Sequence, residues 1–355
     1  MFRKKYESLV ALDVGTSSVK LVELNLDTET PSLVNIGSIR IPPGTFSGSA
    51  ISNTDVVADK IVKLLEEHVL VDRMVVTAMP GPSVFTKKIT VPYTKIKDIH
   101  RNIQFEAANL IPHQIEDVKL DYHIVRQSEE GTSDLIVVAV KNEIVDSFLE
   151  TFEKAGIQLG IIDVDYFALQ NAYELAYPQL FEKTVALIDV GDRYTTVNIC
   201  KEGDSLFAGN ISIGSRGLTE DIIEAFDVDE READKIKRGL DSDDPRAEEL
   251  TQVIESNNNE FAEELNRQLS FFWSAAGGSE SGIDAVLLCG GGQRKGLIGS
   301  LSEETGVPCE LFNPLKGIDC GDKLSSDEIA VQGPRMAVGI GLALREAGDK
   351  FIDWM

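Results

Sequence analysis

No stretch of this sequence runs for 18 apolar residues, so none is expected to cross a membrane as a helix. The first twelve residues carry basic side chains, but Asp13 and Gly15 interrupt the apolar run that follows them. A secretory signal peptide needs a continuous apolar segment at this point, so the pattern argues against one. Both absences predict a chain that neither spans a membrane nor is secreted.

Cysteine and histidine are also scarce, with four residues of each. The thiols form no C-x-x-C pair, and reduced thiols of this kind fit a reducing compartment, so we expect a cytosolic protein. The histidines are spread without the spacing of a metal site, and no Ser-His-Asp or Cys-His pair can be inferred. The cysteines are Cys200, Cys289, Cys309 and Cys320.

Positive charge is in deficit, because 34 lysines and arginines face 59 aspartates and glutamates, for a formal net charge of −25. Nucleic-acid binding requires clustered basic side chains, so the charge argues against a large nucleic-acid footprint. The same deficit disfavours direct adhesion to anionic lipid. Any association with a membrane is therefore expected to be indirect.

The length and patterning indicate a large α/β protein. A chain of 355 residues with 43% hydrophobic content suggests two domains or one bilobed body. Residues 8–81 read as three strands, a helix and a further strand. Strands over 184–190, 194–200 and 205–212 open the second half, and helices alternate with further strands after them. This alternation is typical of α/β sheets.

Residues 83–162 show a different, mixed pattern. A strand over 84–92 precedes a helix over 94–112, and two strands over 118–127 and 134–141 follow. A further helix and strand complete the segment. We expect a compact module inserted into the first half of the chain.

A short motif occurs twice, at about half the chain length apart. "LDVGTSSVKLVEL" aligns with "IDVGDRYTTVNIC", so that Asp13 matches Asp189 and Gly15 matches Gly191. In each copy a buried strand leads to the aspartate, and a second strand follows a short turn. The duplication predicts two lobes of similar topology, each presenting an Asp-x-Gly hairpin.

The tip of the first hairpin has the chemistry of a phosphate cradle. Glycine lets the backbone expose its N–H groups, and Gly15 is followed by the hydroxyls of Thr16, Ser17 and Ser18. Lys20 adds a positive charge. Asp13 and its counterpart Asp189 would repel phosphate, but they can hold Mg²⁺ through its water ligands.

A third motif supports this interpretation, since one Asp-x-Gly hairpin alone is an ordinary turn. The strand pattern "AVLLC" ends in Gly290, Gly291 and Gly292, and a helix is expected from Arg294 onward. A turn without side chains between strand and helix lets a planar ring or a ribose approach the backbone closely.

Together these motifs resemble the actin-like ATPase superfamily, which includes actin, the seventy-kilodalton chaperones, sugar kinases and the division protein FtsA. "LDVGTSS", "LIDVGDRYTTV", "LLCGGGQRKGL" and "MAVGIGLAL" are similar to its two phosphate motifs, its adenosine motif and its second connecting helix. Lys20 follows Asp13 by seven positions, as a phosphate-binding lysine does in actin. The resemblance implies a bilobed fold of duplicated ribonuclease H-like domains.

Within the superfamily the chain resembles the PilM family of cytoplasmic type IV pilus assembly proteins. "FEAANLIPHQIEDVKLDYHIV" is similar to the subdomain that this family and FtsA insert into the first lobe, and "GIIDVDYFALQNAY" to its first connecting helix. The resemblance divides the chain into the first lobe (1–82), the FtsA-like inserted subdomain (83–162), a connecting helix (163–183), the second lobe (184–333) and a C-terminal connecting helix (334–355).

The resemblance also implies the binding site, with ATP between the lobes and Mg²⁺ held through water near Asp13 and Asp189. Asp165 matches a carboxylate near the attacking water in relatives, where it would serve as a base or only as a structural acid, so turnover is left open. The implied ATP contacts are Gly15, Thr16, Ser17, Ser18, Lys20, Gly191, Asp192, Gly214, Ser215, Arg216, Lys237, Gly290, Gly291, Gly292 and Arg294.

The implied partner is PilN, whose N-terminal cytoplasmic tail would dock in a groove between the first lobe and the inserted subdomain. Phe105, Leu110 and Ile111 are candidates to line that groove, although each is individually more typical of core packing. Such docking would hold the protein at the inner membrane, together with other pilus components. Self-association is left open.

Two alternatives within the superfamily remain. "DVGTSSVK" also resembles sugar kinases, but the chain is short for them and the inserted module fits the adaptor branch better. A filament former like FtsA would bind lipid through a basic amphipathic C-terminal helix. Here the end of the chain, "LREAGDKFIDWM", is short and acidic.

Overall fold

The first lobe is built on a five-stranded mixed sheet, in a computed structural model that describes residues 9–129, 131–241, 243–275 and 282–346. The central strand β1 pairs antiparallel with β2 and parallel with β6. The strand order is β10-β6-β1-β2-β3. The strands are β1 (Val10–Val14), β2 (Ser18–Asn25), β3 (Ser32–Arg40), β6 (Val75–Met79) and β10 (Leu159–Val164).

The second lobe repeats this topology. Its central strand β11 pairs antiparallel with β12 and parallel with β14, in the order β13-β12-β11-β14-β15. Each strand therefore has a counterpart in the first sheet, which confirms the predicted duplication. The strands are β11 (Val185–Val190), β12 (Thr195–Lys201), β13 (Asp204–Ile211), β14 (Ala285–Cys289) and β15 (Cys309–Leu311).

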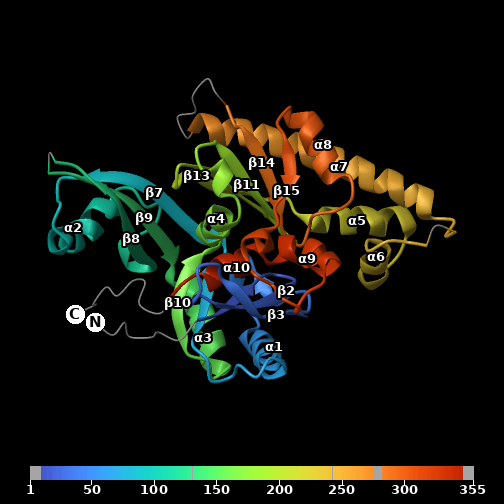
Figure 1. Cartoon of the computed structure of the whole chain (residues 1–355), viewed down its shortest axis with the longest axis horizontal. Helices are drawn as coiled ribbons and strands as arrows, with labels where there is room; N and C mark the ends of the chain where they lie inside the picture. Colours follow the sequence, from blue (N-terminus) through green and yellow to red (C-terminus); the bar gives the residue numbers. More distant parts are fainter. Residues whose placement is uncertain (1–8, 130, 242, 276–281, 347–355) are drawn as a thin grey trace.

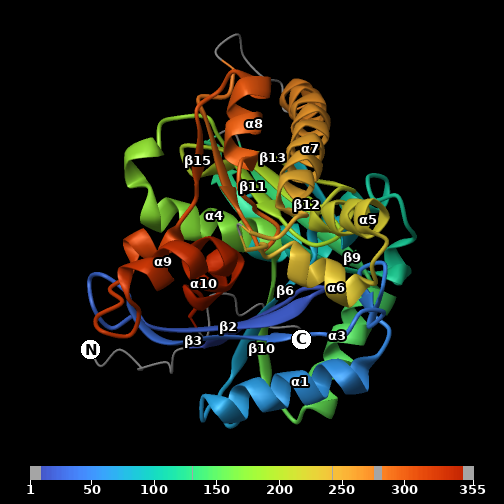
Figure 2. The same ribbon diagram turned by 90° about the vertical axis from the view of Figure 1, so that its right-hand side faces the viewer.

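Helices fill three layers around the two sheets, as Figure 2 shows from the edge. Two lie between the sheets, and α10 is buried on every side there. Two cover the outer face of each sheet. The inner helices are α4 (Asp165–Ala176) and α10 (Ala337–Ala343), and the outer ones are α1 (Thr54–Glu67), α3 (Asn142–Lys154), α7 (Ala247–Ala275) and α8 (Leu297–Thr305).

The alternation of side chains along β1 explains this layering. Ala11 faces the inner helices, whereas Val10 and Leu12 pack toward α1 and α3. Successive strand residues point to opposite faces, so a strand that is buried on both faces is apolar throughout. Within the described residues no helix is both long and apolar enough to cross a membrane.

The inserted module stands apart with its own core (Figure 1). Its sheet has the order β7-β9-β8, and one helix packs against it. The elements are β7 (Val84–Val91), α2 (Ile96–Ala108), β8 (Val118–Gln127) and β9 (Ser133–Lys141), with short helices η1 (Gly81–Ser83) at its start and η2 (Ile115–Asp117) before β8.

The sequence-based end of this module, residue 162, is wrong. Helix α3 buries Phe148 and Phe152 against the first-lobe sheet and α1. Strand β10 pairs in parallel with β6, as an integral strand of the first lobe. The module therefore ends with β9, and the expected helix and strand after it belong to the first lobe.

The stretch before residue 333, the expected end of the second lobe, packs between the two sheets. After β15 the chain returns to the space between the sheets, where Phe312 and Leu315 join the core around α4 and α10. Leu33 donates its N–H to the carbonyl of Asp319 at 2.9 Å, which ties this segment to β3. Residues 347–355, part of the expected C-terminal helix, lie outside the described residues.

The remaining elements are short or peripheral. Helices α5 and α6 pack with the start of α7 in a small separate cluster beside the second sheet. The elements are α5 (Ser215–Phe226), α6 (Glu230–Ile236), α9 (Ser326–Gln332), β4 (Phe46–Ser47), β5 (Ala50–Ile51), η3 (Pro178–Leu180), η4 (Pro314–Gly317) and η5 (Gly333–Met336).

Candidate nucleotide cleft

The two Asp-x-Gly hairpins are closed by the same backbone bond. Gly15 donates its N–H to the carbonyl of Ser18, and Gly191 donates to the carbonyl of Tyr194, each at 3.0 Å. A Cβ on Gly191 would lie 2.7 Å from that carbonyl oxygen, so the second turn has no room for a side chain there. The sequence repeat therefore corresponds to a repeated turn geometry.

The two hairpins approach each other between the lobes. The Lys20 ammonium lies 2.8 Å from the Asp13 carboxylate in the first hairpin. Although burial opposes it, the pKa of Lys20 is raised, because Asp13 and Asp189 both stabilise the ammonium. Burial raises the pKa of Asp189 to about 6, with Lys20 lowering it and Asp13 raising it further. Carboxylates from both halves of the chain thus share one electrostatic environment.

Asp165, at the start of α4, is the third carboxylate of this environment. Burial raises its pKa to about 7, a backbone hydrogen bond from Gly81 opposes the rise, and Asp189 adds to it. Its Oδ2 accepts the N–H of Gly81 at 2.8 Å and the hydroxyl of Thr196 at 3.4 Å, while Oδ1 accepts its neighbour's N–H at 2.6 Å. Both oxygens are engaged by structural donors, and the role of Asp165 as a base stays a prediction.

The glycine-rich turn after β14 packs against the second hairpin. Gly290 has φ +97°, and a Cβ there would lie 2.2 Å from the Asp189 Oδ1. Gly292 donates its N–H to the Val190 carbonyl at 2.8 Å, and a Cβ on Gly292 would also clash. No atom lies within 4 Å of a Cβ built on Gly291. Two of the three glycines therefore serve close packing, and the middle one faces open space.

This difference predicts opposite phenotypes for neighbouring substitutions. Gly290→Ala is expected to destabilise the fold by on the order of 3 kcal/mol, because of its positive φ and the clash with Asp189. Gly291→Val is expected to keep the unfolding midpoint and to weaken nucleotide binding by filling open space. Urea unfolding and nucleotide titration measure the two effects, and equal unfolding midpoints for both variants would contradict the assignment.

The start of α5 is fastened to the second hairpin. Ser215 donates its N–H to the Gly191 carbonyl at 2.9 Å, and Arg216 donates to the Asp192 carbonyl at 2.8 Å. A Cβ on Gly214 would lie 2.4 Å from the Asp192 carbonyl oxygen. These contacts bring together the predicted residues 191–192 and 214–216, and they leave the helix N-terminus beside the turn, where anions are favoured.

Lys237 lies on the same side of the cleft, just after α6. Its ammonium donates to the Ser215 carbonyl at 2.6 Å and to the Thr219 hydroxyl at 2.8 Å. Burial lowers its pKa, against the attraction of Asp192. Lys237 therefore braces α5 in this structure, and its contact with adenosine stays a prediction.

Arg294 is directed toward α7. It donates to the Asn257 side chain and to the Gly292 carbonyl, and its guanidinium lies 5.2 Å from the centre of the Phe261 ring. Burial lowers its pKa to about 10. In this position Arg294 holds the glycine-rich turn against α7. The only sequence signal for its α7 partners was the polar run "SNNNEF" inside a predicted helix.

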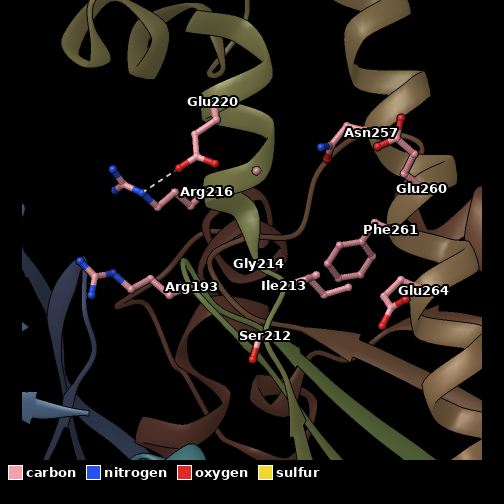
Figure 3. A pocket seen from close by; sticks show the side chains of 11 residues that line it. Arg193, Ser212, Ile213, Gly214, Arg216, Glu220, Asn257, Glu260, Phe261 and Glu264 are labelled. Atoms are coloured by element: carbon pink, nitrogen blue, oxygen red, sulfur yellow. Dashed lines mark ion pairs between the residues drawn. The ribbon is translucent and has the colours of Figure 1, made fainter. Parts of the chain in front are cut away.

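A cavity of about 450 Å³ lies beside this region, between α5 and α7 (Figure 3). Among the predicted ATP contacts only Gly214 and Arg216 line it, and neither hairpin aspartate does. The cavity thus adjoins the cleft at the second hairpin and the start of α5, and the carboxylates themselves lie outside its lining. Arg193, which the sequence analysis missed as a site residue, reaches it from the second hairpin.

The three candidates for the partner groove do not form one surface. The Phe105 side chain is 74% exposed on α2, whereas Ile111 is buried in the core of the inserted module. Leu110 is half-buried after the helix end. Ile111 is thus a core residue, packed in the cluster that includes Ile103 and Ala107 of α2. Of the three, Phe105 has the exposure that a partner contact needs.

The residues of the cleft fit a magnesium–nucleotide complex in their chemistry. The paired hairpins offer turn N–H groups and carboxylates, and the space at Gly291 is open. Among the described residues no group of three or more His, Cys, Asp or Glu is placed to ligate a metal directly. A hydrated Mg²⁺ needs few protein ligands, so the water-mediated site that the sequence predicts at Asp13 and Asp189 would not require such a group.

Two sheets of equal topology, with paired hairpins at their junction, define an actin-like fold with an inserted subdomain. Residues 11–347 match the family model described as type IV pilus assembly protein PilM. The chain therefore belongs to this family.

Comparison with known proteins agrees with this assignment. A solved structure titled "PilM-PilN type IV pilus biogenesis complex" is similar with a TM-score of 0.83 and 28% identity, covering 96% of this chain and 99% of that one. MreB5 of Spiroplasma citri bound to ADP shares the fold, with a TM-score of 0.51 and 12% identity over 94% of each chain.

A more distant relative is the cell division protein FtsA of Bacillus subtilis (strain 168), which is 22% identical over 262 residues. The match covers 66% of this chain and 58% of FtsA. This chain thus spans a little over half the length of that relative.

Proposed function

We propose that the protein is a nucleotide-binding adaptor of the type IV pilus inner-membrane complex, which binds Mg²⁺–ATP between its lobes and the N-terminal cytoplasmic tail of PilN through its inserted subdomain. The main observation that supports this proposal is the convergence of two Asp-x-Gly hairpins in a chain of the PilM family. The similar structure with a TM-score of 0.83 comes from a complex with PilN, which supports the choice of partner.

In the proposed cleft each residue class has a distinct task. The N–H groups of the turns at 15–18 and 191–192 and the start of α5 would hold the phosphates. Asp13 and Asp189 would orient the water ligands of Mg²⁺, and the bound ion would supply charge neutralisation for the phosphates. Lys237 and the turn at 290–292 would border the nucleoside. Hydrolysis is not required of an adaptor.

The buried carboxylates support the presence of a divalent cation in the working state. The pKa values of Asp165 and Asp189 are raised mainly by burial and further by neighbouring negative charge. A cation between the hairpins would remove that repulsion. Lys20 does not do so by itself, because its ammonium is already paired with Asp13. Nucleotide binding is therefore expected to depend on Mg²⁺.

Calorimetric titration with ATP, with and without Mg²⁺, tests the nucleotide site. Asp13→Ala is expected to lower Mg²⁺–ATP affinity by roughly tenfold or more, since a cation-orienting carboxylate and the partner of Lys20 are both lost. Asp98→Ala, on the solvent side of α2, is the matched control and should bind as the unaltered protein does. Unchanged affinity in both Asp13→Ala and Gly291→Val would rule out this cleft.

Binding of a synthetic peptide with the sequence of a PilN cytoplasmic tail tests the partner assignment. Phe105→Ala is expected to weaken peptide binding, with less than about 0.5 kcal/mol lost in stability, because its side chain is exposed on α2. Absence of binding to the unaltered protein would contradict the adaptor role.

Light scattering with ATP, and a screen of sugars for ADP release, would then separate a filament former from a sugar kinase.

A further inference from the structure

The proposed cleft is short of uncommitted positive charge. Asp13, Asp165 and Asp189 share one environment there, and Asp192 lies near Lys237 on its second-lobe side. A magnesium-bound triphosphate adds a net charge of about −2 to this environment. Lys20 is already held at 2.8 Å by Asp13. A further cation from the protein would therefore favour the binding of a triphosphate in this place.

Most arginines around the cleft already have partners. Arg40 of β3 pairs with Asp234 of α6 at 2.9 Å, across the two lobes. Arg216 pairs with Glu220 at 3.2 Å, as Figure 3 shows. Arg294 is bonded to Asn257. These three guanidiniums are held in place by acidic or polar neighbours.

Arg193 differs from them, although it sits on the tip of the second hairpin. Throughout the described part of the chain its side chain has no ion-pair or hydrogen-bond partner, in a protein with an excess of 25 acidic groups. In Figure 3 it extends away from Phe261 and Glu264, toward the side on which the first-lobe ribbon lies. A half-buried guanidinium without a partner retains its full capacity for a ligand.

The backbone fixes where Arg193 starts. The turn is closed by the bond from Gly191 to the Tyr194 carbonyl, and the neighbouring Asp192 carbonyl accepts the Arg216 N–H. A Cβ on Gly214 would lie 2.9 Å from the Arg193 nitrogen, so the α5 start packs directly on this residue. The side chain is long and free, but its attachment point is rigid.

We propose that Arg193 binds the terminal phosphate of a nucleoside triphosphate and makes the cleft prefer triphosphate over diphosphate. This inference rests on the proposed nucleotide function. The guanidinium offers a planar fork that pairs with two phosphate oxygens, and such charge-assisted bonds are about twice as strong as neutral ones. A residue on the turn of the second lobe that contacts the terminal phosphate also favours closure of the two lobes.

Competitive titration with ATP and ADP in the presence of Mg²⁺ tests the inference. In the Arg193→Ala variant we expect ATP affinity to fall by roughly tenfold to a hundredfold, with ADP affinity changed by less than about twofold. Arg193→Lys keeps the charge but loses the fork of N–H donors. Its ATP affinity should lie between those of the unaltered protein and Arg193→Ala. Arg126→Ala is the control, since this arginine lies on β8 of the inserted module, away from the cleft, and is paired with Asp134 at 2.9 Å.

The outcomes separate the two proposals. If the unaltered protein binds both nucleotides and Arg193→Ala lowers their affinities by the same factor, or lowers neither, the role of Arg193 is overturned while the cleft stands. If the unaltered protein binds neither nucleotide, both proposals fail. If the Arg193→Ala and Arg193→Lys variants unfold at the same midpoint as the unaltered protein, the loss of affinity is a local effect on binding.

Discussion

Replacing Gly341 by alanine is expected to destabilise the protein by about 3–5 kcal/mol, because the added methyl group has no space to occupy. A Cβ at this position would lie 1.7 Å from the carbonyl oxygen of Ala168, which belongs to the backbone of α4. Because α4 and α10 are packed between the two sheets, neither helix can move aside without disturbing both lobes. Urea unfolding should show a much lower midpoint.

The matched control for this substitution is Gly299→Ala. Gly299 lies in α8, and no atom is found within 4 Å of a Cβ built on it. Alanine is favoured over glycine in a helix by up to about 1 kcal/mol, so this variant should be as stable as the unaltered protein or slightly more so. If Gly341→Ala unfolded at the same urea concentration as Gly299→Ala, the close crossing of α4 and α10 would be incorrect.

Stability of the unliganded protein is expected to depend on pH through Asp165. Its carboxyl group has a pKa of about 7 in the folded chain, against an ordinary value of 3.8. A group that binds its proton more tightly when folded favours folding most below the unfolded pKa, and this advantage is lost as pH rises through the folded pKa. The contribution of Asp165 therefore falls between about pH 4 and pH 7, by on the order of 4 kcal/mol.

The measurement is the difference in unfolding free energy between the unaltered protein and Asp165→Asn across pH 4 to 8. This difference should decrease with rising pH and become flat above about pH 7. Asp134→Asn is a control of opposite sign, because hydrogen bonds from Thr90 and Arg126 lower the pKa of Asp134. The difference in unfolding free energy between the unaltered protein and Asp134→Asn should shrink only as pH falls below about 4. A difference for Asp165 that stays constant with pH would disprove the raised pKa.

The duplication and the hairpins were accessible from sequence because their signals are local. An Asp-x-Gly turn between two apolar strands has the same pattern wherever it occurs, and two copies at half the chain length define two lobes. The sheets confirm this, strand for strand. The placement of the candidate cleft between the lobes was implied by the resemblance to the actin-like superfamily.

The boundary of the inserted module was not accessible in this way. Helix α3 and strand β10 have the same local pattern whether they belong to the module or to the first lobe. Only the parallel pairing of β10 with β6, and the burial of Phe148 against the first-lobe sheet, decides between these assignments. Likewise, a helical pattern near 94–112 cannot separate the exposed Phe105 from the buried Ile111.

By itself, then, the sequence determined the α/β class, the duplicated hairpins and the residue types of a phosphate site, since each depends on neighbours within a few positions along the chain. The tertiary structure decided which of the three glycines at 290–292 faces open space. It also showed that Asp165 accepts a hydrogen bond from Gly81, at the start of the inserted module. Finally, it left Arg193 without a partner among the described residues. Those properties arise from distances between segments that are remote in sequence, and no local pattern encodes such distances.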